Sequence, residues 1–264
     1  MACPFFFSAA GKRFMPDFNG DGHADILWRN EKTGQNVVWL MNGSTRMSSK
    51  FLPSFADTNW QLAGSGDINN DGNSDVLWRH KTTGQNAVWL MNGITRTSVV
   101  FLPTIADLNY QCVGFADFNG DHKTDILWRH NISGRNVLWV MDDAVQTDAF
   151  YLSALTDVNW VCGGVADFNN DGHADVMWRH KTTGKNAVWY FNGTAKTGFA
   201  YLSTLPDANW KCEGLGDFNN DGKPDVIWRH AVNGTNAVWY FNGVKQSGFA
   251  YLPALASLDW ELVN

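Results

Sequence analysis

Apolar and polar residues alternate in short runs along the whole chain, and no stretch shows the 3.6-residue spacing of an amphipathic helix. One representative stretch contains four such runs, WQLAGSGD (60–67), SDVLWRH (74–80), QNAVWLMN (85–92) and VVFLPTIAD (99–107). Gly, Asn and Asp residues typical of turns separate them. The proline in the fourth run favours an edge strand, because proline cannot donate a ladder hydrogen bond. The pattern predicts four strands.

These four runs form a unit of 50 residues that recurs five times without insertion or deletion. The aspartates that open the acidic loop mark the repeats: Asp17, Asp67, Asp117, Asp167 and Asp217. A repeat of about 20 to 50 residues indicates a solenoid, a propeller or an array. Helical solenoids need a helical period and β-helices need a much shorter repeat, so four strands per unit favour the blades of a β-propeller.

The two ends of the chain predict how the ring closes. AGKRFMP stands before the first acidic loop, where the second unit has the strand WQLAGSG. The last residues, DWELVN (259–264), match NWQLAG (59–64) and supply the missing strand. We therefore predict an all-β fold, a five-bladed β-propeller of four-stranded antiparallel blades, closed by the C-terminal strand. A tail (1–14) would precede a single propeller domain (15–264), expected to be monomeric; a fragment of a larger ring or a multichain assembly is the alternative.

The acidic loop has the pattern of a metal site. In DFNGDGHAD (17–25), oxygen-bearing side chains occupy positions 1, 3, 5 and 9, and position 7 offers its main-chain carbonyl. Such a set suits a hard cation, Ca²⁺ before Mg²⁺. An ion-free Asn- and Asp-rich turn is the alternative, but closely spaced carboxylates repel one another in all five copies. An EF-hand would need Glu at position 12, where Trp28 stands here.

The D-x-N-x-D-G-x-x-D loop within a four-stranded unit resembles the FG-GAP and VCBS-type repeats of integrin alpha-chain propellers and propeller lectins. The resemblance covers residues 15–264 and implies one Ca²⁺ per blade, up to five in all, bound by four side chains and one carbonyl. The implied ligands are Asp17, Asn19, Asp21, His23, Asp25, Asp67, Asn69, Asp71, Asn73, Asp75, Asp117, Asn119, Asp121, Lys123, Asp125, Asp167, Asn169, Asp171, His173, Asp175, Asp217, Asn219, Asp221, Lys223 and Asp225. The third loop has His122 in place of glycine and is predicted to be the weakest site.

Charge and composition exclude several classes of protein. The formal net charge is −6 and the 20 basic residues are scattered, which argues against nucleic-acid binding and against an anionic membrane surface. No apolar run approaches the roughly 20 residues of a membrane span. Fifteen of the 26 acidic residues lie in the loops, so five bound Ca²⁺ would take the formal charge to +4. The opening MACPFFFSAAGKRF lacks the pattern of a secretory signal, yet the calcium loops predict an extracellular or cell-surface location.

Tryptophan and cysteine follow the repeat as well. Every Trp falls in the column of Trp28, Trp39 or Trp60, and uniform placement in strands predicts packing between blades rather than ligand stacking. Cys112, Cys162 and Cys212 stand where other units have leucine, which predicts small core residues instead of redox or metal chemistry.

A polar column follows the first Trp column in each repeat, with two interpretations. Each Arg could pair with a nearby carboxylate, Asp57, Asp107, Asp157 or Asp207, and tie blades together. Alternatively, Arg, His and Asn residues could form repeated ligand pockets between blades. The residues concerned are Arg29, Arg79, His80, Asn86, Arg129, His130, Asn136, Arg179, His180, Asn186, Arg229, His230 and Asn236, together with Asn30 and Asn36 of the first unit.

These features predict a non-catalytic calcium-binding module for binding or adhesion, with a multivalent glycan as the expected ligand in the manner of a lectin. A structural or protein-interaction propeller without a sugar ligand is the first alternative. A polysaccharide-active enzyme is the second, but fivefold uniformity does not supply an asymmetric carboxylate pair. Glu213 is a non-repeated acid on an expected inner strand, where it could line the central channel, although a solvated or paired carboxylate is the favoured interpretation. No Ser-His-Asp order, phosphate loop or zinc spacing indicates catalysis.

Overall fold

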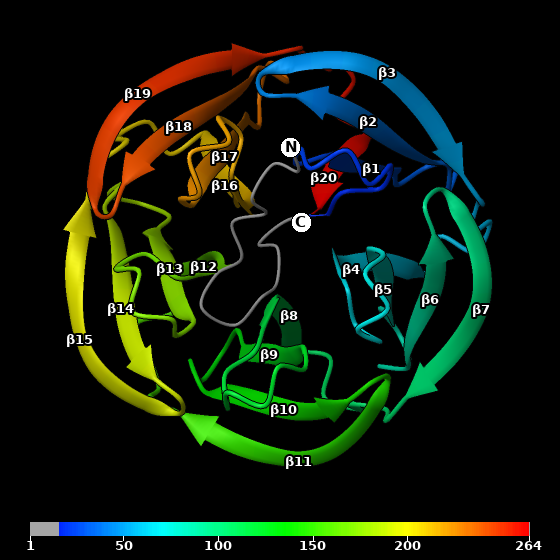
Figure 1. Ribbon diagram of the computed structural model, residues 1–264, viewed down its shortest axis with the longest axis horizontal. Coiled ribbons are helices and arrows are strands. Elements are labelled where there is room, and N and C mark those ends of the chain that lie inside the picture. Colours follow the sequence, from blue (N-terminus) through cyan, green and yellow to red (C-terminus); the bar gives the residue numbers. More distant parts are fainter. Residues whose placement is uncertain (1–15, 264) are drawn as a thin grey trace, which may run out of the picture.

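The computed structural model describes residues 16–263, which form twenty β-strands and no helix. Five four-stranded antiparallel sheets stand around a common axis as the blades of a propeller (Figure 1). The predicted all-β, five-bladed architecture is confirmed. The predicted tail, residues 1–14, lies outside the described residues. The part of the chain that the structure describes contains no helix long and apolar enough to span a membrane.

The blades repeat one strand order, from the inner strand at the axis to the outer edge strand. The first blade is β20 (Trp260–Val263), β1 (Ile26–Asn30), β2 (Asn36–Asn42) and β3 (Thr45–Leu52). The second is β4 (Trp60–Gly66), β5 (Asp75–His80), β6 (Asn86–Asn92) and β7 (Thr95–Leu102). The third is β8 (Tyr110–Ala116), β9 (Asp125–His130), β10 (Asn136–Asp142) and β11 (Val145–Leu152). The fourth is β12 (Trp160–Ala166), β13 (Asp175–His180), β14 (Asn186–Asn192) and β15 (Ala195–Leu202). The fifth is β16 (Trp210–Gly216), β17 (Asp225–His230), β18 (Asn236–Asn242) and β19 (Lys245–Leu252).

The ring closes as the sequence predicts. β20 pairs antiparallel with β1, with Arg29 opposite Glu261 and Asn30 opposite Trp260. The C-terminal segment therefore completes the blade that the N-terminal part of the chain begins. This pairing leaves no blade without its inner strand.

The outer strands differ from the sequence prediction. The fourth strand of the second blade is Thr95–Leu102, whereas the apolar run had suggested residues 99–107. Pro103 lies just beyond the strand and its carbonyl accepts a hydrogen bond from the Asn86 amide, 2.7 Å. The polar start of the strand is exposed at the rim, so hydrophobicity did not mark it. Its position at the blade edge is confirmed.

The hydrophobic core is divided among the joints between blades. One cluster joins Leu27 and Val38 of the first blade to Val76 and Trp78 of the second, and four similar clusters occupy the other joints. The Trp28 column is fully buried, at 0–1% exposure, which confirms its predicted packing role. Burial of an aromatic ring of this size is the main stabilisation available to each joint.

The inner strands approach one another closely. Gly164 has φ +136°, and a Cβ atom there would lie 2.7 Å from Cγ of Leu215 on the next inner strand. The neighbouring Cys162 and Cys212 pack partly buried against these joints, as predicted. Burial raises the pKa of the Cys162 thiol to about 12, so it behaves as an apolar group.

Candidate functional site

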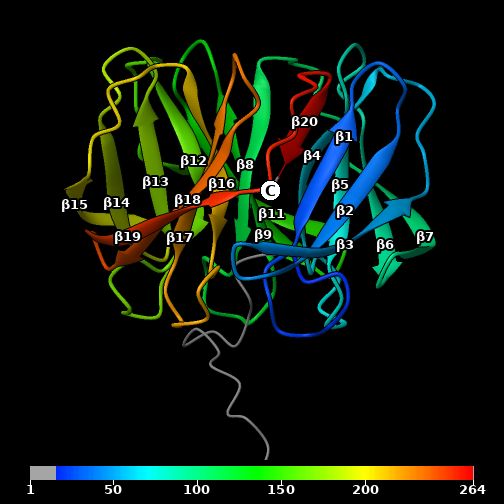
Figure 2. The same cartoon turned by 90° about the horizontal axis from the view of Figure 1, so that it is seen from above.

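The five acidic loops lie on one face of the propeller, and each leads into the second strand of its blade (Figure 2). In the second to fifth blades the loop begins after a small residue of the inner strand and ends in the aspartate that opens the second strand. These four loops are therefore held at both ends by the sheet, between the two strands where the sequence places them. The first loop follows Pro16 and ends in Asp25, directly before β1, because the inner strand of its blade is the C-terminal β20.

Side-chain oxygens organise the loop internally. In the first loop, Oδ1 of Asp17 accepts a hydrogen bond from the Gly20 amide at 2.7 Å, and Oδ2 accepts one from Gly22 at 2.8 Å. Oδ1 of Asp21 accepts from the His23 amide at 2.9 Å. The remaining loops repeat most of these bonds. The Asp side chains at these positions therefore stabilise the turn through hydrogen bonds to main-chain amides, in addition to any ion that they bind.

The ninth residue of each loop connects the loop to the third strand of the blade, counted from the propeller axis. The Asp75 carboxylate is fully buried and accepts hydrogen bonds from the main-chain amides of Ile68, at 3.1 Å, and Met91, at 2.9 Å. The same two bonds occur in every blade. Position 9 therefore anchors the loop on the sheet.

Burial makes this carboxylate unfavourable as a bare anion. Burial, with a smaller contribution from the nearby Asp71, raises the pKa of Asp75 to about 7 against the lowering effect of its main-chain hydrogen bonds. The pKa values of the equivalent aspartates rise to about 6 or about 7 for the same leading reason: Asp25, Asp125, Asp175 and Asp225. A bound cation offsets both desolvation and mutual repulsion of such carboxylates.

The sixth position of every loop has a left-handed backbone. Gly22, Gly72, Gly172 and Gly222 have φ between +80° and +91°. His122 occupies the corresponding place in the third loop with φ +67°, and its Nδ1 lies 3.8 Å from Oδ2 of Asp117. A residue with a Cβ adopts this positive φ at a cost in free energy, which glycine does not incur.

The oxygen donors of the loops fit a hard cation, and they include amide and main-chain oxygens as well as carboxylates. Among residues 16–263, no three or more His, Cys, Asp or Glu side chains are gathered as a ready metal-binding group. The loop oxygens of Asp, Asn and the main chain together, rather than carboxylates alone, are what an ion would use.

The arginine column is buried and serves the joints. Nη1 of Arg79 donates to the carbonyl of Gly84 and to Oδ1 of Asn86, both at 3.1 Å, and Nη2 donates to the carbonyls of Ile105 and Asp107, both at 3.0 Å. The other four arginines repeat this pattern with small changes in acceptor. Bonds to main-chain carbonyls therefore replace the expected pairing with Asp57, Asp107, Asp157 or Asp207, and only Arg29 of the column has a carboxylate nearby, with Nε 3.5 Å from Oε1 of Glu31.

Each arginine also stacks on the next blade. The guanidinium carbon of Arg29 lies 4.8 Å from the centroid of the Trp78 ring, and Arg129 lies 4.7 Å from that of Trp178. The Arg and Asn columns are 0–6% exposed. Their hydrogen-bonding groups therefore point into the protein, which leaves the histidines as the accessible members of the predicted pockets.

The aspartates that were expected to pair with the arginines lie beside the histidines instead. Nε2 of His130 lies 2.9 Å from Oδ2 of Asp107, and three other blades contain the same pair at 3.3–3.5 Å. The main-chain amide of Asn109 lowers the pKa of Asp107, and His130 contributes to this shift. The first blade has Asn30 and Ser257 at these two places, so this pair changes together at the closing joint.

An exposed aromatic column was missed from the sequence. Its members are 61–72% exposed on the outer strands: Phe51, Phe101, Tyr151, Tyr201 and Tyr251. In the second blade, Trp60 packs edge-on against His80, with ring centroids 5.1 Å apart, and lies 6.5 Å from Phe101. These rings lie at the ends of the strands opposite the acidic loops. An aromatic residue before leucine every 50 residues was the available signal.

Two non-repeated acids lie on neighbouring inner strands. Glu213 is on β16 and Glu261 on β20, the innermost strands in Figure 1. Burial and, to a smaller extent, the charge of Glu261 raise the pKa of Glu213 to about 7, and Arg229 opposes the shift. Glu213 is thus half-buried at the ring's inner edge, where the sequence had placed it.

The fold and the loops define a class: a five-bladed β-propeller with an acidic, oxygen-rich loop in every blade. A model of the FG-GAP-like repeat matches residues 17–78, 67–128 and 167–228, and the chain belongs to this family. No curated protein sequence matches the chain.

Several solved structures resemble this chain at low sequence identity. A chain in a nidogen/laminin complex is 12% identical with a TM-score of 0.51, over 90% of this chain and 96% of that one. A protein of unknown function from Bacteroides caccae is 7% identical with a TM-score of 0.44, over 86% and 72%. An auxiliary nutrient binding protein from Bacteroides thetaiotaomicron is 8% identical with a TM-score of 0.49, over 93% and 57%.

Proposed function

We propose that this protein is a calcium-binding, non-catalytic binding module that engages glycans outside the cell or at its surface. The observation that carries the calcium part is the recurrence of one oxygen-rich loop in all five blades. Each loop ends in a buried aspartate, such as Asp75, whose pKa is raised by burial and by a neighbouring carboxylate. Five independent copies of an electrostatically unfavourable loop are explained by one resident cation per blade.

Calcium would neutralise the loops and fix each one against its sheet. Asp17, Asn19, Asp21, Asp25 and the carbonyl of His23 would hold the ion in the first loop, and the equivalent residues would do so in the others. The ion supplies positive charge and coordination but no chemistry of bond breaking. Loop ligands of this kind suit the millimolar calcium outside cells.

Elemental analysis after dialysis tests the calcium proposal. We expect up to five calcium ions per chain, and a lower melting temperature after EGTA because a ligand bound only to the folded state stabilises it. The variant Asp75→Asn removes one ligand, and Asp148→Asn, a change of an exposed outer-strand acid, is its control. No bound calcium, together with an unchanged melting curve in EGTA, would refute the proposal.

The exposed aromatic column supports glycan binding. Five exposed rings occupy equivalent positions on the outer strands. In four blades, the aromatic residue that begins the inner strand also packs against a histidine, so the surfaces are repeated and equivalent. Aromatic faces pack against the C–H face of a sugar ring, and repeated weak sites gain strength from multivalency. A glycan array screened with and without calcium tests this, and Tyr201→Ala should lower binding relative to the exposed control Lys185→Ala. An array without binding would favour a protein partner or a purely structural module.

The absence of catalysis belongs to the same proposal. The repeated sites are near-identical, whereas glycoside hydrolysis needs two carboxyl groups in different roles. Glu213 and Glu261 are the acids to test, and Glu213→Gln should leave binding unaltered. Turnover of a polysaccharide that this variant abolishes would contradict the proposal.

A further inference from the structure

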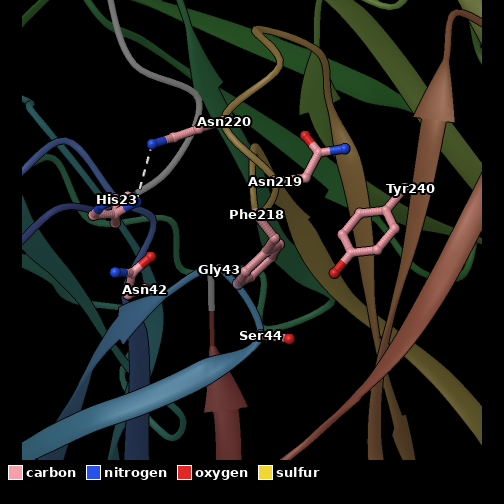
Figure 3. A pocket seen from close by; sticks show the side chains of 8 residues that line it. All are labelled: His23, Asn42, Gly43, Ser44, Phe218, Asn219, Asn220 and Tyr240. Carbon is pink, nitrogen blue, oxygen red and sulfur yellow. Dashed lines mark hydrogen bonds between the residues drawn. The ribbon is translucent and has the colours of Figure 1, made fainter.

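The joint between the fifth and first blades contains a pocket of about 270 Å³ on the face of the acidic loops. Side chains of both blades point toward it (Figure 3). They include His23, Asn42, Ser44, Phe218, Asn220 and Tyr240. The volume is near the lower end of the range for small-molecule sites, roughly 300 Å³ and above, and suits a compact ligand.

The combination of a tyrosine and a serine hydroxyl in this pocket occurs at the closing joint and does not recur at the equivalent positions of the other four. Tyr240 and Ser44, each with a hydroxyl group, both line the pocket there. At the corresponding places the fourth-to-fifth joint has Tyr190 and Val244, both packed against its apolar cluster. The remaining joints pair an aliphatic residue with Ile94, Ala144 or Thr194. The blades are near-identical in sequence, but they differ at these two positions, so a ligand that needs both hydroxyls would bind at the closing joint.

The lining groups select the class of ligand. Hydroxyls of Ser44 and Tyr240, side-chain amides of Asn42 and Asn220, and the His23 imidazole provide both donors and acceptors. No carboxylate, lysine or arginine is among the lining residues, so neither a free cation nor an anion finds a countercharge. We propose that this pocket binds a neutral pyranose, whose hydroxyls match these groups while its C–H face meets the Tyr240 ring.

Two acidic loops form the walls of the pocket. Nδ2 of Asn220 in the fifth loop lies 3.0 Å from Nδ1 of His23 in the first, a contact drawn in Figure 3. Asn219, which also lines the pocket, is the third residue of the fifth loop. Sugar binding here is coupled to calcium, and this coupling rests on the proposed function: an ion in either loop fixes one wall and lowers the ordering cost of binding.

The test is a ¹H–¹⁵N NMR titration of the full chain with glucose, galactose, mannose and N-acetylglucosamine, each with calcium and with EGTA. We expect one sugar to shift the side-chain amides of Asn42 and Asn220, with weaker binding in EGTA. Tyr240→Phe removes one hydroxyl and should weaken binding about tenfold, the effect of one hydrogen bond. Tyr190→Phe is the matched control, because it lies in an identical strand sequence, NAVWYFN, at a joint where Val244 takes the place of Ser44.

A second variant protects the test against misfolding. Ser44→Val copies the residue of the fourth-to-fifth joint, Val244, and should abolish the amide shifts while the rest of the spectrum keeps its folded dispersion. Unshifted Asn42 and Asn220 amides with all four sugars overturn the inference, as does equal weakening by Tyr240→Phe and Tyr190→Phe. Calcium content is measured on the same samples. Bound calcium without shifts of the Asn42 and Asn220 amides would refute sugar binding in the pocket and leave the calcium proposal intact. The absence of bound calcium would refute the calcium proposal.

Discussion

The guanidinium carbon of Arg229 lies 4.9 Å from the centroid of the Trp28 ring, so the last complete blade packs on the first through the contact that joins every other pair of blades. Arg179 makes the preceding step in the ring, 4.9 Å from Trp228. The five contacts form an unbroken cycle through the chain's two ends. Ring closure therefore depends on buried cation–π stacking as well as on the β20–β1 ladder.

We predict that Arg229→Lys destabilises the fold by about 2–4 kcal/mol, because lysine cannot make the forked hydrogen bonds and a buried ammonium is left with unpaired acceptors. Arg229 donates to the carbonyls of Gly234, Leu255 and Ser257 at 3.0–3.2 Å. Urea unfolding measures the change, and the exposed Arg135→Lys is the control. Equal unfolding free energies for the two variants would show that the buried fork is not stabilising.

The thiols give a second prediction. Burial raises the pKa of Cys112 and Cys162 to about 12, and raises that of Cys212 as well. In a Cys3→Ser background these three thiols should react with Ellman's reagent only after denaturation, since thiolate is the reactive form. A rapid native reaction of even one would show an exposed, ionised thiol and contradict the core role.

Repetition made most of the fold predictable. The fifty-residue period fixed the blade and its four strands, and the match of DWELVN to NWQLAG fixed closure. The Trp28 column was assignable to the core because a ligand site has no reason to recur identically in every strand centre. The partners of the arginines were not predictable, since the acceptor on Nη2 of Arg79 is a carbonyl 26 residues away whose position depends on the joint.

The candidate sites were less predictable for related reasons. The exposed aromatic column was visible as a repeat, but exposure is set by which strand forms the rim, and the outer strand was placed too far along the chain. The pocket at the closing joint needs residues as distant as Ser44 and Tyr240. Sequence similarity between blades hides such a site, because it consists of departures from the repeat.

His122 provides a prediction for the third loop. Its φ of +67° is favourable for glycine and costs about 1 kcal/mol or more for a residue with a Cβ. His122→Gly should stabilise the protein by about 0.5–1 kcal/mol and strengthen the weakest calcium site. The reverse change in the fourth loop, Gly172→His, should weaken that site. Competition with a chromophoric chelator measures both, and a third site that His122→Gly leaves unaltered would contradict the assignment.

The buried aspartates predict an inverted pH dependence without calcium. The pKa of Asp75 rises to about 7 in the folded chain, and those of Asp175 and Asp225 do the same. A carboxyl with a raised folded pKa stabilises the fold when protonated, fully so below its unfolded pKa of about 3.9, and this stabilisation is lost as pH rises through about 7. In EGTA, the melting temperature should therefore fall between about pH 4 and pH 7.

Calcium should reverse this trend, because protons and the ion compete for the same oxygens and binding is strongest when the aspartates are ionised. With calcium in excess, the melting temperature should hold or rise over the interval in which it falls in EGTA. The pKa of Glu213 is also raised to about 7, so Glu213 adds a pH dependence of stability that calcium does not change. The variant Glu213→Gln removes this contribution from the melting profile. Parallel pH profiles in EGTA and calcium would mean that the ion does not bind at these aspartates, while a reversal lost in Asp75→Asn would locate part of it at the second loop.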